Sequence, residues 1–374
     1  MKTMMISDLP VDLLEDILSR VLFKSIGAVR STCKKWNVLS KDERFANKHI
    51  EKTAASQRDK EVLVITVNTK DHLISVKFYD FHDKNFDPSI NRNGILSTRE
   101  KSDQVVSVHH VFYCNGLLLC LCRGNNKRGL VVCNPYWGKR RWIKNPTERS
   151  YEMFAFGYDK SCRRTHKVLR LSSDDNIVIH IDIYDLSCDT WKTPDEAFHS
   201  SFIEYKKPGV SLKGNTYWLA KGRDSENCYL LCFDFTSERF GARLPLPFDF
   251  TYGCNVSLSC VKEEKLAVLF KPRGGGIFET IDVWVTDKIE PDAVSWSKLL
   301  KFETFKLNFR SLFGSFLIDE ESKTFVIFDN CEESFETYII DWESGHFRKA
   351  ESIEASHSRL DNLVGCYVPS SVQI

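Results

Sequence analysis

The feature that most constrains the fold of this chain is a repeat of short apolar runs that begins after residue 60. Runs such as "EVLVITV", "GLVVCN" and "KLAVLF" are rich in β-branched residues or leucine and are bounded by Gly, Asn, Asp or Pro, a pattern typical of strands. Corresponding points of successive copies are Asn134, Asp185, Asp234, Val283 and Asp341, in steps of 51, 49, 49 and 58 residues, and a weaker copy places Asp80 54 residues before Asn134.

A period near 50 residues built only from strands predicts the four-stranded blades of a β-propeller of the kelch class. A twisted sheet exposes two apolar faces, and radial stacking of sheets covers both. The predicted fold class is therefore mainly β, a kelch-like propeller of six blades when the weak copy is counted, with seven blades as the alternative. The apolar tail "LVGCYVPSSV" is predicted to return to the first blade and close the ring.

The first 50 residues carry helix signals instead. In "SDLPVDLLEDILSRV" the apolar residues lie on a single helical face, and Pro10 fits the first turn. A second helix is predicted from an N-cap at Ser25 through "IGAVRSTCKKWNVLS". We therefore expect a helical module at residues 1–50, a polar segment at 51–60 that is a linker or a frayed helix end, and the propeller at 61–374.

A module of this size is too small for a robust core of its own, so much of its apolar face must meet something else. Periodicity alone leaves two partners open, the propeller of the same chain or another protein.

Composition narrows the classes of function. The formal net charge is +1, with no basic stripe, so neither nucleic-acid binding nor an anionic membrane surface is expected. No stretch reaches about 18 apolar residues, so no membrane span is expected either. The 13 cysteines form no CxxC pair, which favours buried thiols in a reducing compartment over metal binding. The expected location is the cytoplasm, the nucleus or both.

An enzymatic propeller would need converging catalytic side chains. The ten histidines are dispersed, and zincin, P-loop, serine-nucleophile and dinucleotide motifs are absent from the sequence. We therefore expect no catalytic residue, no cofactor and no metal site.

The segment "LPVDLLEDILSRVLFKSIGAVRSTCKKW" resembles an F-box in register and without a gap. Leu22 stands where the F-box pattern has proline and Asp16 where it has Glu, while Val21, Ile26 and Thr32 are conservative replacements. The matching residues are Leu9, Pro10, Asp12, Leu13, Leu14, Ile17, Leu18, Arg20, Lys24, Ser25, Arg30, Cys33, Lys34 and Trp36.

The rest of the chain is similar to the kelch-associated domain of the large plant family of F-box proteins. The landmarks are "YCNGLLLC", "VVCNPYWGKRRWI", "GVSLKGNTYWLA", "CFDFTSERF", "PLPF" and "YVPSSV".

This resemblance implies a substrate-recognition subunit of an SCF-type ubiquitin ligase, with catalysis performed by other subunits. The module would bind a Skp-type adaptor and, through it, a cullin and a RING subunit, while the propeller would bind a protein substrate. The implied adaptor contacts are Leu9, Pro10, Leu13, Leu14, Ile17, Leu18, Val21 and Ile26, and the implied module core includes Cys33 and Trp36.

Two further expectations follow. The polar loops "RGNNKRG", "KGRDSEN" and "KPRGGGIFE" are candidates for a binding face of the propeller, although each also fits an ordinary solvated turn. The alternative function is an interaction module that acts outside an SCF complex, because the Leu22 departure leaves room for a weakened or lost adaptor contact.

Overall fold

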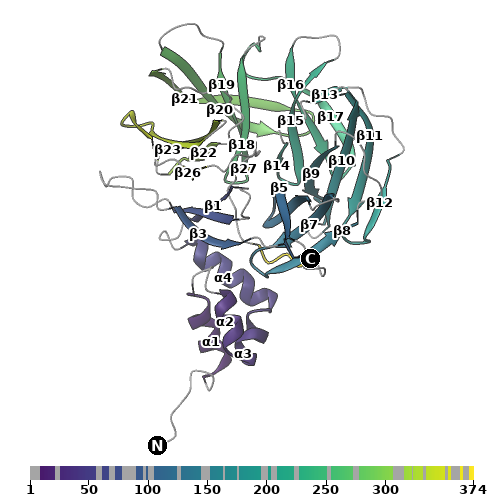
Figure 1. The fold of residues 1–374 in the computed structure, drawn as a ribbon, viewed down its shortest axis with the longest axis vertical. Coiled ribbons are helices and arrows are strands. Elements are labelled where there is room, and N and C mark those ends of the chain that lie inside the picture. Colours follow the sequence, from purple (N-terminus) through teal and green to yellow (C-terminus); the bar gives the residue numbers. More distant parts are fainter. Residues whose placement is uncertain are drawn as a thin grey trace, which may run out of the picture.

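The protein is seen here in a computed structural model, with the helical module below a ring of sheets (Figure 1). The structure describes residues 9–21, 26–55, 61–66, 72–77, 90–95, 98–99, 105–123, 128–144, 152–162, 165–174, 177–194, 201–203, 209–222, 227–250, 254–272, 278–305, 316–321, 323–331, 334–349, 353–354, 363–364 and 370–374. None of the helices in these ranges is long and apolar enough to cross a membrane.

The helical module contains four helices: α1 (Val11–Leu18), α2 (Ile26–Thr32), α3 (Lys34–Leu39) and α4 (Glu43–Ala55). Pro10 occupies the N-cap of α1, and its carbonyl accepts the first helical hydrogen bond from Leu14 N at 3.1 Å. Asp42 caps α4, because its Oδ1 accepts from Arg44 N at 2.9 Å and from Phe45 N at 3.1 Å.

The prediction of one long second helix is wrong. Cys33 is extended, with φ −153° and ψ 160°, and divides the segment into α2 and α3. Its Sγ accepts a hydrogen bond from Trp36 N at 3.4 Å, so the thiol serves as the N-cap of α3. Helix α4 runs to Ala55, five residues into the segment 51–60.

After the module, the described strands form five antiparallel sheets, which are arranged around a ring (Figure 1). The first holds β1 (Glu61–Thr66), β2 (His72–Lys77), β3 (Ile90–Ile95) and β27 (Leu363–Val364), and the second holds β4 (Thr98–Arg99), β5 (Val105–Cys114), β6 (Leu117–Arg123), β7 (Arg128–Asn134) and β8 (Lys139–Ile143).

The third sheet is the largest, with β9 (Glu152–Tyr158), β10 (His166–Asp174), β11 (Ile177–Asp185), β12 (Thr190–Lys192), β13 (Ser201–Ile203), β14 (Val210–Leu212), β15 (Asn215–Gly222), β16 (Cys228–Asp234) and β17 (Arg239–Leu244). The fourth has β18 (Asn255–Val261), β19 (Lys265–Lys271), β20 (Phe278–Ile289) and β21 (Val294–Phe305), and the fifth has β22 (Phe316–Asp319), β23 (Thr324–Cys331), β24 (Ser334–Asp341), β25 (His346–Lys349) and β26 (Ile353–Glu354).

A mainly β propeller behind a small helical module is therefore confirmed, but the blade count is corrected. The described strands form five blades, counted as hydrogen-bonded sheets, and not six or seven. The reason is β13, which pairs with β11 through Ile177 and Phe202 and also with β15. The third and fourth sequence units thus join edge to edge in one nine-stranded sheet.

The predicted closure of the ring by the C-terminal tail is confirmed. Strand β27 pairs antiparallel with β1, with Val364 opposite Val64 and Leu363 opposite Ile65. The last described strand therefore completes the first sheet, so the ring depends on pairing between segments from its two ends.

The repeated Asp or Asn has a structural cause in the turn that follows the third strand of a unit. The side-chain Oδ1 accepts from the backbone N–H two residues on, at 2.8 Å from Asn134, 2.7 Å from Asp185, 3.0 Å from Asp234 and 2.9 Å from Asp341. Four residues beyond each of these comes a left-handed residue: Gly138, Asp189, Glu238 and Gly345. Val283 marks no such turn, because β20 continues to Ile289.

The core lies between neighbouring sheets and uses the apolar runs of the repeat. One cluster contains Phe112, Leu119 and Val132 of the second sheet together with Phe156 and Val168 of the third. A second cluster joins the fourth and fifth sheets. Burial of both faces of each sheet is what the sequence pattern requires.

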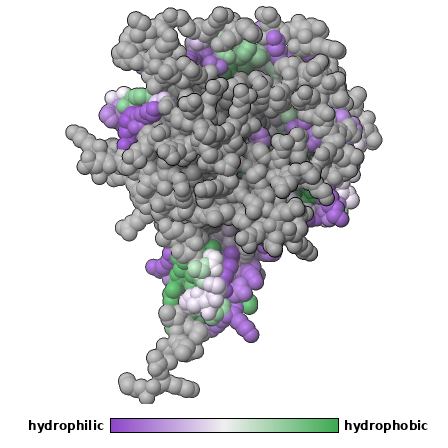
Figure 2. Space-filling view, viewed as in Figure 1, coloured by the Kyte–Doolittle hydropathy of each residue, from purple (hydrophilic) through white to green (hydrophobic). Residues whose placement is uncertain are grey.

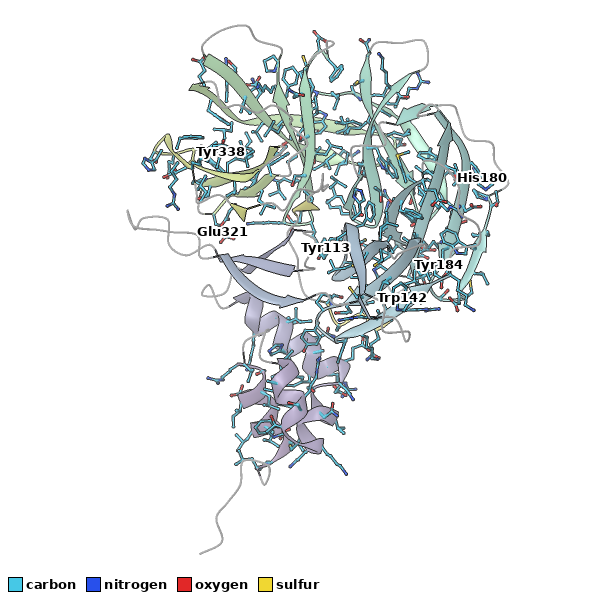
Figure 3. All side chains as sticks on the ribbon, in the orientation of Figure 1. Tyr113, Trp142, His180, Tyr184, Glu321 and Tyr338 are labelled. Atoms are coloured by element: carbon cyan, nitrogen blue, oxygen red, sulfur yellow. The ribbon has the colours of Figure 1, made fainter. Side chains whose placement is uncertain are left out.

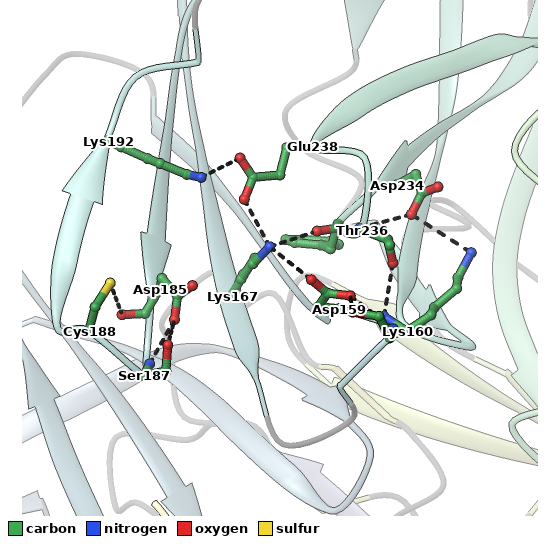
Figure 4. Close-up of polar contacts among 12 residues, drawn as sticks. Asp159, Lys160, Lys167, Asp185, Ser187, Cys188, Lys192, Asp234, Thr236 and Glu238 are labelled. Carbon is green, nitrogen blue, oxygen red and sulfur yellow. Dashed lines mark hydrogen bonds and ion pairs between the residues drawn. The ribbon is translucent and has the colours of Figure 1, made fainter.

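The two units of the third sheet are also linked by a buried cation (Figure 4). Lys167 Nζ donates to Phe235 O at 3.0 Å and to Glu238 Oε1 at 2.8 Å, and lies 3.6 Å from Asp159 Oδ2. Lys192 Nζ reaches the other oxygen of Glu238 at 2.6 Å. Burial would raise the pKa of Glu238, but the hydrogen bonds from Lys167 and Lys192 outweigh it and hold that pKa below its ordinary 4.5.

The module is joined to the second sheet through the turn 134–138 that connects β7 to β8. Arg30 Nη1 donates to Tyr136 O at 2.6 Å, and its guanidinium lies 5.2 Å from the Tyr136 ring centroid and 5.1 Å from that of Trp137. Ala46 and Ile50 of α4 pack on the same two aromatic residues. We call this contact the Arg30–Tyr136 junction.

The same turn holds the C-terminus of the chain. Asn134 Nδ2 donates to Ser370 O at 3.0 Å and to Val372 O at 2.6 Å, and Trp137 Nε1 donates to Ser371 O at 3.0 Å. Ser370 covers Gly116 so closely that a Cβ there would lie 2.0 Å from the Ser370 Cβ. One turn therefore fixes both the module and the tail.

Replacing Lys167 tests the link within the third sheet. Lys167→Met leaves two carboxylates without their shared cation, so we expect the free energy of unfolding at pH 7 to fall by about 2–3 kcal/mol. Chemical denaturation measures this. The control is Lys288→Met, which removes an exposed pair with Glu290 and should cost less than about 0.5 kcal/mol.

The pH dependence of the stability of this variant tests the direction of the Glu238 pKa shift. The folded pKa of Glu238 lies below the unfolded value, so its stabilising contribution is present above the unfolded pKa and is lost as pH falls through the folded pKa. Wild-type stability should therefore decline as pH falls below 4.5, and Lys167→Met should decline less steeply. Parallel pH profiles for the two proteins would contradict the assignment.

Replacing Arg30 tests the junction. Arg30→Ala removes the hydrogen bond to Tyr136 O, two longer hydrogen bonds to Ser40 and two ring contacts, so we expect a loss of about 2–3 kcal/mol and faster hydrogen exchange in α4 and in residues 134–138. The control is Arg20→Ala, because Arg20 makes an exposed i,i+4 pair with Asp16 at 2.7 Å and should cost less than about 0.5 kcal/mol. Equal effects of the two substitutions would refute this role for Arg30.

Candidate adaptor-binding site

The small core of the module decides which apolar residues stay at the surface. Leu18, Ile26 and Phe45 form its buried centre, and Val21, Val29, Trp36 and Leu39 pack against them while remaining partly exposed. Leu14 is also fully buried. Helix α4, which supplies Phe45, was not predicted as a separate helix; the Asp42 cap and the periodic Phe45, His49 and Lys52 were the available signal.

Three of the predicted adaptor contacts are therefore inside the module. Leu14 and Leu18 point from α1 into the core and Ile26 joins them from α2, so none of the three is available at the surface of this structure. The sequence pattern marked them correctly as apolar, but periodicity does not separate a residue that faces its own core from one that faces a partner.

The remaining predicted contacts are exposed to different degrees. Leu13 is 53% exposed and Ile17 is 46% exposed, and they lie one turn apart on α1. Pro10 is exposed, whereas Leu9 and Val21 are half-buried. Val11 at 52% and Val38 of α3 at 72% add exposed apolar surface that the sequence motif did not indicate as adaptor contacts. We call Val11, Leu13, Ile17 and Val38 the exposed apolar set.

The polar side of α1 faces α4. Lys52 Nζ lies 2.6 Å from Asp16 Oδ1 and donates to Ser19 Oγ at 3.0 Å, and Lys48 Nζ lies 3.8 Å from Glu15 Oε2. The hydrogen bond from Lys52, followed by that from Arg20, lowers the pKa of Asp16. Because α4 takes up these polar groups, the Leu13 and Ile17 flank of α1 is turned away from it.

The two predicted module-core residues have different roles. Trp36 packs against the buried cluster, whereas Cys33 is half-buried and caps α3. His49 of α4 is buried between the module and the propeller, where its Nε2 lies 2.6 Å from Val21 O and its ring is 5.8 Å from that of Tyr136. Burial lowers the pKa of His49, which favours the neutral ring.

Within the described residues, the propeller covers one side of the module and leaves part of its apolar surface exposed. The propeller receives Arg30, Ala46, His49 and Ile50, and it does not cover the exposed apolar set. Hydrophobic surface is visible on the module in Figure 2 beside strongly polar surface. An exposed apolar patch rimmed by polar residues is typical of a protein-binding surface.

The other predicted features lie elsewhere. The candidate loops fall largely at residues 124–127, 223–226 and 273–277, which lie outside the described residues. Leu22, the departure from the F-box pattern, also lies outside them. Within the described ranges, no group of three or more His, Cys, Asp or Glu residues could hold a metal ion.

A matched pair of substitutions tests the division between core and surface. Leu14→Ala should cost about 2–5 kcal/mol in module stability, because it opens a cavity, whereas Leu13→Ala should cost less than about 0.5 kcal/mol. Hydrogen exchange of the α1 and α4 amides reports the difference. Comparable losses from the two neighbours would show that Leu13 is also buried.

Comparison with known proteins identifies both parts of the chain. An F-box domain model matches residues 6–48, and an F-box associated β-propeller domain model matches residues 59–374. The F-box protein At3g20690 of Arabidopsis thaliana is 47% identical over 99% of this chain and 100% of its own length. The putative F-box/kelch-repeat protein At3g20710 of the same plant is 42% identical over 97% of this chain and 99% of its own length.

These matches confirm the resemblance drawn from the sequence motifs, since they cover the helical module and the ring of sheets together. The chain therefore belongs to the family of plant F-box proteins that join an N-terminal F-box to an F-box associated β-propeller.

Proposed function

We propose that this protein is a substrate receptor of an SCF-type ubiquitin ligase, in which the F-box binds a Skp-type adaptor and the propeller binds a target protein. The observation that carries the proposal is the exposed apolar set, which belongs to a matched F-box domain and is left uncovered by the propeller. The adaptor would connect the receptor to a cullin and a RING subunit.

The proposed adaptor contact is an apolar helical flank laid into a partner groove. Leu13 and Ile17 form its centre, since they are spaced by one helical turn and are about half exposed. Pro10 extends it at the start of α1, with Leu9 beside it, whereas Val11 lies on the other side of α1 from Leu13 and Ile17. Val38 adds exposed apolar surface on α3, whose Lys35 Nζ donates to Leu9 O at 3.1 Å. Burial of Leu13 and Ile17 would supply most of the apolar gain, at about 25 cal/mol per Å².

The proposed role of the chain is to hold a substrate near the ligation chemistry, and not to perform that chemistry. Tethering raises the effective concentration of substrate lysines near a ubiquitin-conjugating enzyme bound by the other subunits. The Arg30–Tyr136 junction supports this role, because it fixes the module on the propeller. Such a receptor would work in the cytoplasm or the nucleus.

The test is adaptor binding by a double variant. Leu13→Asp with Ile17→Asp places two carboxylates in the proposed interface without altering the core, so we expect adaptor affinity to fall by at least about 100-fold, which corresponds to about 2.7 kcal/mol. Titration of a purified Skp-type adaptor by calorimetry measures this, with thermal unfolding as the check on folding.

The matched control is Phe347→Asp, which makes the same chemical change at an exposed apolar residue of the propeller. It should bind the adaptor as the wild type does. If the wild-type chain fails to bind the adaptor, the protein acts outside an SCF complex. If the double variant binds the adaptor unchanged, the contact does not involve the Leu13 and Ile17 flank and the proposed surface is wrong.

A further inference from the structure

A buried histidine lies at the contact between the module and the propeller, outside the proposed adaptor surface. His49 of α4 is fully buried, and its ring centroid lies 5.8 Å from that of Tyr136 in the turn 134–138. On its other side is Phe45, one helical turn earlier on α4, whose ring stacks on it at 5.9 Å. The histidine ring is therefore enclosed by one aromatic residue from each part of the chain.

One nitrogen of the His49 ring has a fixed role. Nε2 lies 2.6 Å from the carbonyl oxygen of Val21, which can only accept, so Nε2 carries a proton whether the ring is neutral or charged. Charging the ring therefore adds a proton at Nδ1, an atom that is buried from solvent. The added charge enters a site that water does not reach.

Arg30 of α2 is the charged group that acts on this ring. Its guanidinium lies 5.2 Å from the centroid of the Tyr136 ring, the same ring that borders His49. Tyr136 itself is neutral at pH 7, because burial raises its pKa to about 12. A charged His49 would therefore share the face of one aromatic ring with a second cation, and the two cations would repel each other.

The acidic groups of the module do not offset such a charge. No carboxylate in the described part of the chain contributes to the pKa of His49. On α1, Glu15 and Asp16 are paired with Lys48 and Lys52 of α4. A proton taken up by the ring would thus remain without a counter-charge at the contact.

The direction of the pKa shift follows from these contacts. Burial lowers the pKa of His49 below its ordinary 6.5, the hydrogen bond to Val21 O opposes this, and the charge of Arg30 adds to it. Because the folded pKa lies below the unfolded one, neutral His49 contributes stability that is present above pH 6.5 and is lost as pH falls through the folded pKa. Both forms of the ring donate to Val21 O, so separation from Tyr136 is the movement that lets water reach the charge at least cost.

We propose that His49 makes the contact between the module and the propeller sensitive to acid: when its ring takes up a proton, the Arg30–Tyr136 junction opens while the module and the sheets stay folded. At neutral pH the uncharged ring packs between Phe45 and Tyr136 and the junction is closed. The opening depends on the contacts of the junction alone. That it changes the position of a substrate relative to the adaptor rests on the proposed function.

The first experiment measures the opening of the junction in the full-length protein. Hydrogen exchange, corrected for the intrinsic rate at each pH, gives the opening equilibrium of the amides in residues 45–50 and 134–138. Because the open form takes up a proton with an ordinary pKa of 6.5, its population should rise several-fold between pH 7.5 and pH 5.5, with an upper limit of about 10-fold. Amides of β19 are the reference and should change less than about 2-fold. An unchanged junction, or an equal change in β19, would overturn the proposal.

A matched pair of histidine substitutions locates the effect. His49→Gln keeps a side-chain nitrogen that can donate to Val21 O but takes up no proton, so the pH response of the junction should fall below about 2-fold. The control is His180→Gln, because Figure 3 places His180 near the outer edge of the ring, away from the module, where its Nε2 lies 2.9 Å from Asp182 Oδ1. This control should keep the wild-type response, and a wild-type response in folded His49→Gln would refute the assignment.

Nitrogen NMR of the histidine rings gives a reading that needs no variant. At least one of the ten rings should titrate below 6.5 and hold its proton on Nε2 at neutral pH. Ten rings that all titrate at 6.5 or above would overturn the proposal.

The acid-sensitive contact and the proposed function fail separately. Leu13 and Ile17 lie outside the junction, so Leu13→Asp with Ile17→Asp should lose adaptor binding and keep the wild-type pH response. Adaptor binding without a pH response of the junction would overturn the acid-sensitive contact alone. A pH response in a chain that binds no adaptor would overturn the proposed function alone.

Discussion

The structure depends on one turn, residues 134–138, because this turn forms hydrogen bonds with two distant parts of the chain. Its Tyr136 carbonyl and aromatic rings receive Arg30 of the module, and its Asn134 and Trp137 side chains donate to the carbonyls of residues 370–372. A closed ring needs its last strand beside its first, and the tail that follows that strand ends on this turn. The module is therefore fixed at the place where the ring is completed.

This arrangement separates two kinds of apolar surface on the module. The side formed by α4 and Arg30 meets the propeller, whereas the Leu13 and Ile17 flank of α1 faces away from it. The same end of the second sheet also borders a pocket of about 730 Å³, through Tyr113 and Cys114. The proposed adaptor surface and the propeller thus belong to one connected body, whose geometry is set by hydrogen bonds and aromatic packing at the junction.

Much of the fold was predictable, since the repeat spacing reflects a physical turn. Asn134, Asp185, Asp234 and Asp341 recur because a short side-chain acceptor is needed to close the same four-residue turn. The blade count was not predictable, because it depends on β13, a three-residue strand that joins two units. The extended Cys33 between α2 and α3 was not predicted, because the helical spacing of the apolar residues continues through position 33 although the backbone there is not helical.

The sequence by itself determined the two-part organisation, the strand repeat and the F-box membership, since these follow from local pattern and in-register motifs. Only the tertiary structure decided which face of α1 is free. Leu13 and Leu14 are adjacent and identical in chemistry, yet one is 53% exposed and the other fully buried. They differ in exposure because α4 packs against one side of α1, where Lys52 pairs with Asp16. Such contacts join residues that lie far apart along the chain. Asn215 and Glu263 likewise line one pocket only because the third and fourth sheets pack side by side through β14 and β18.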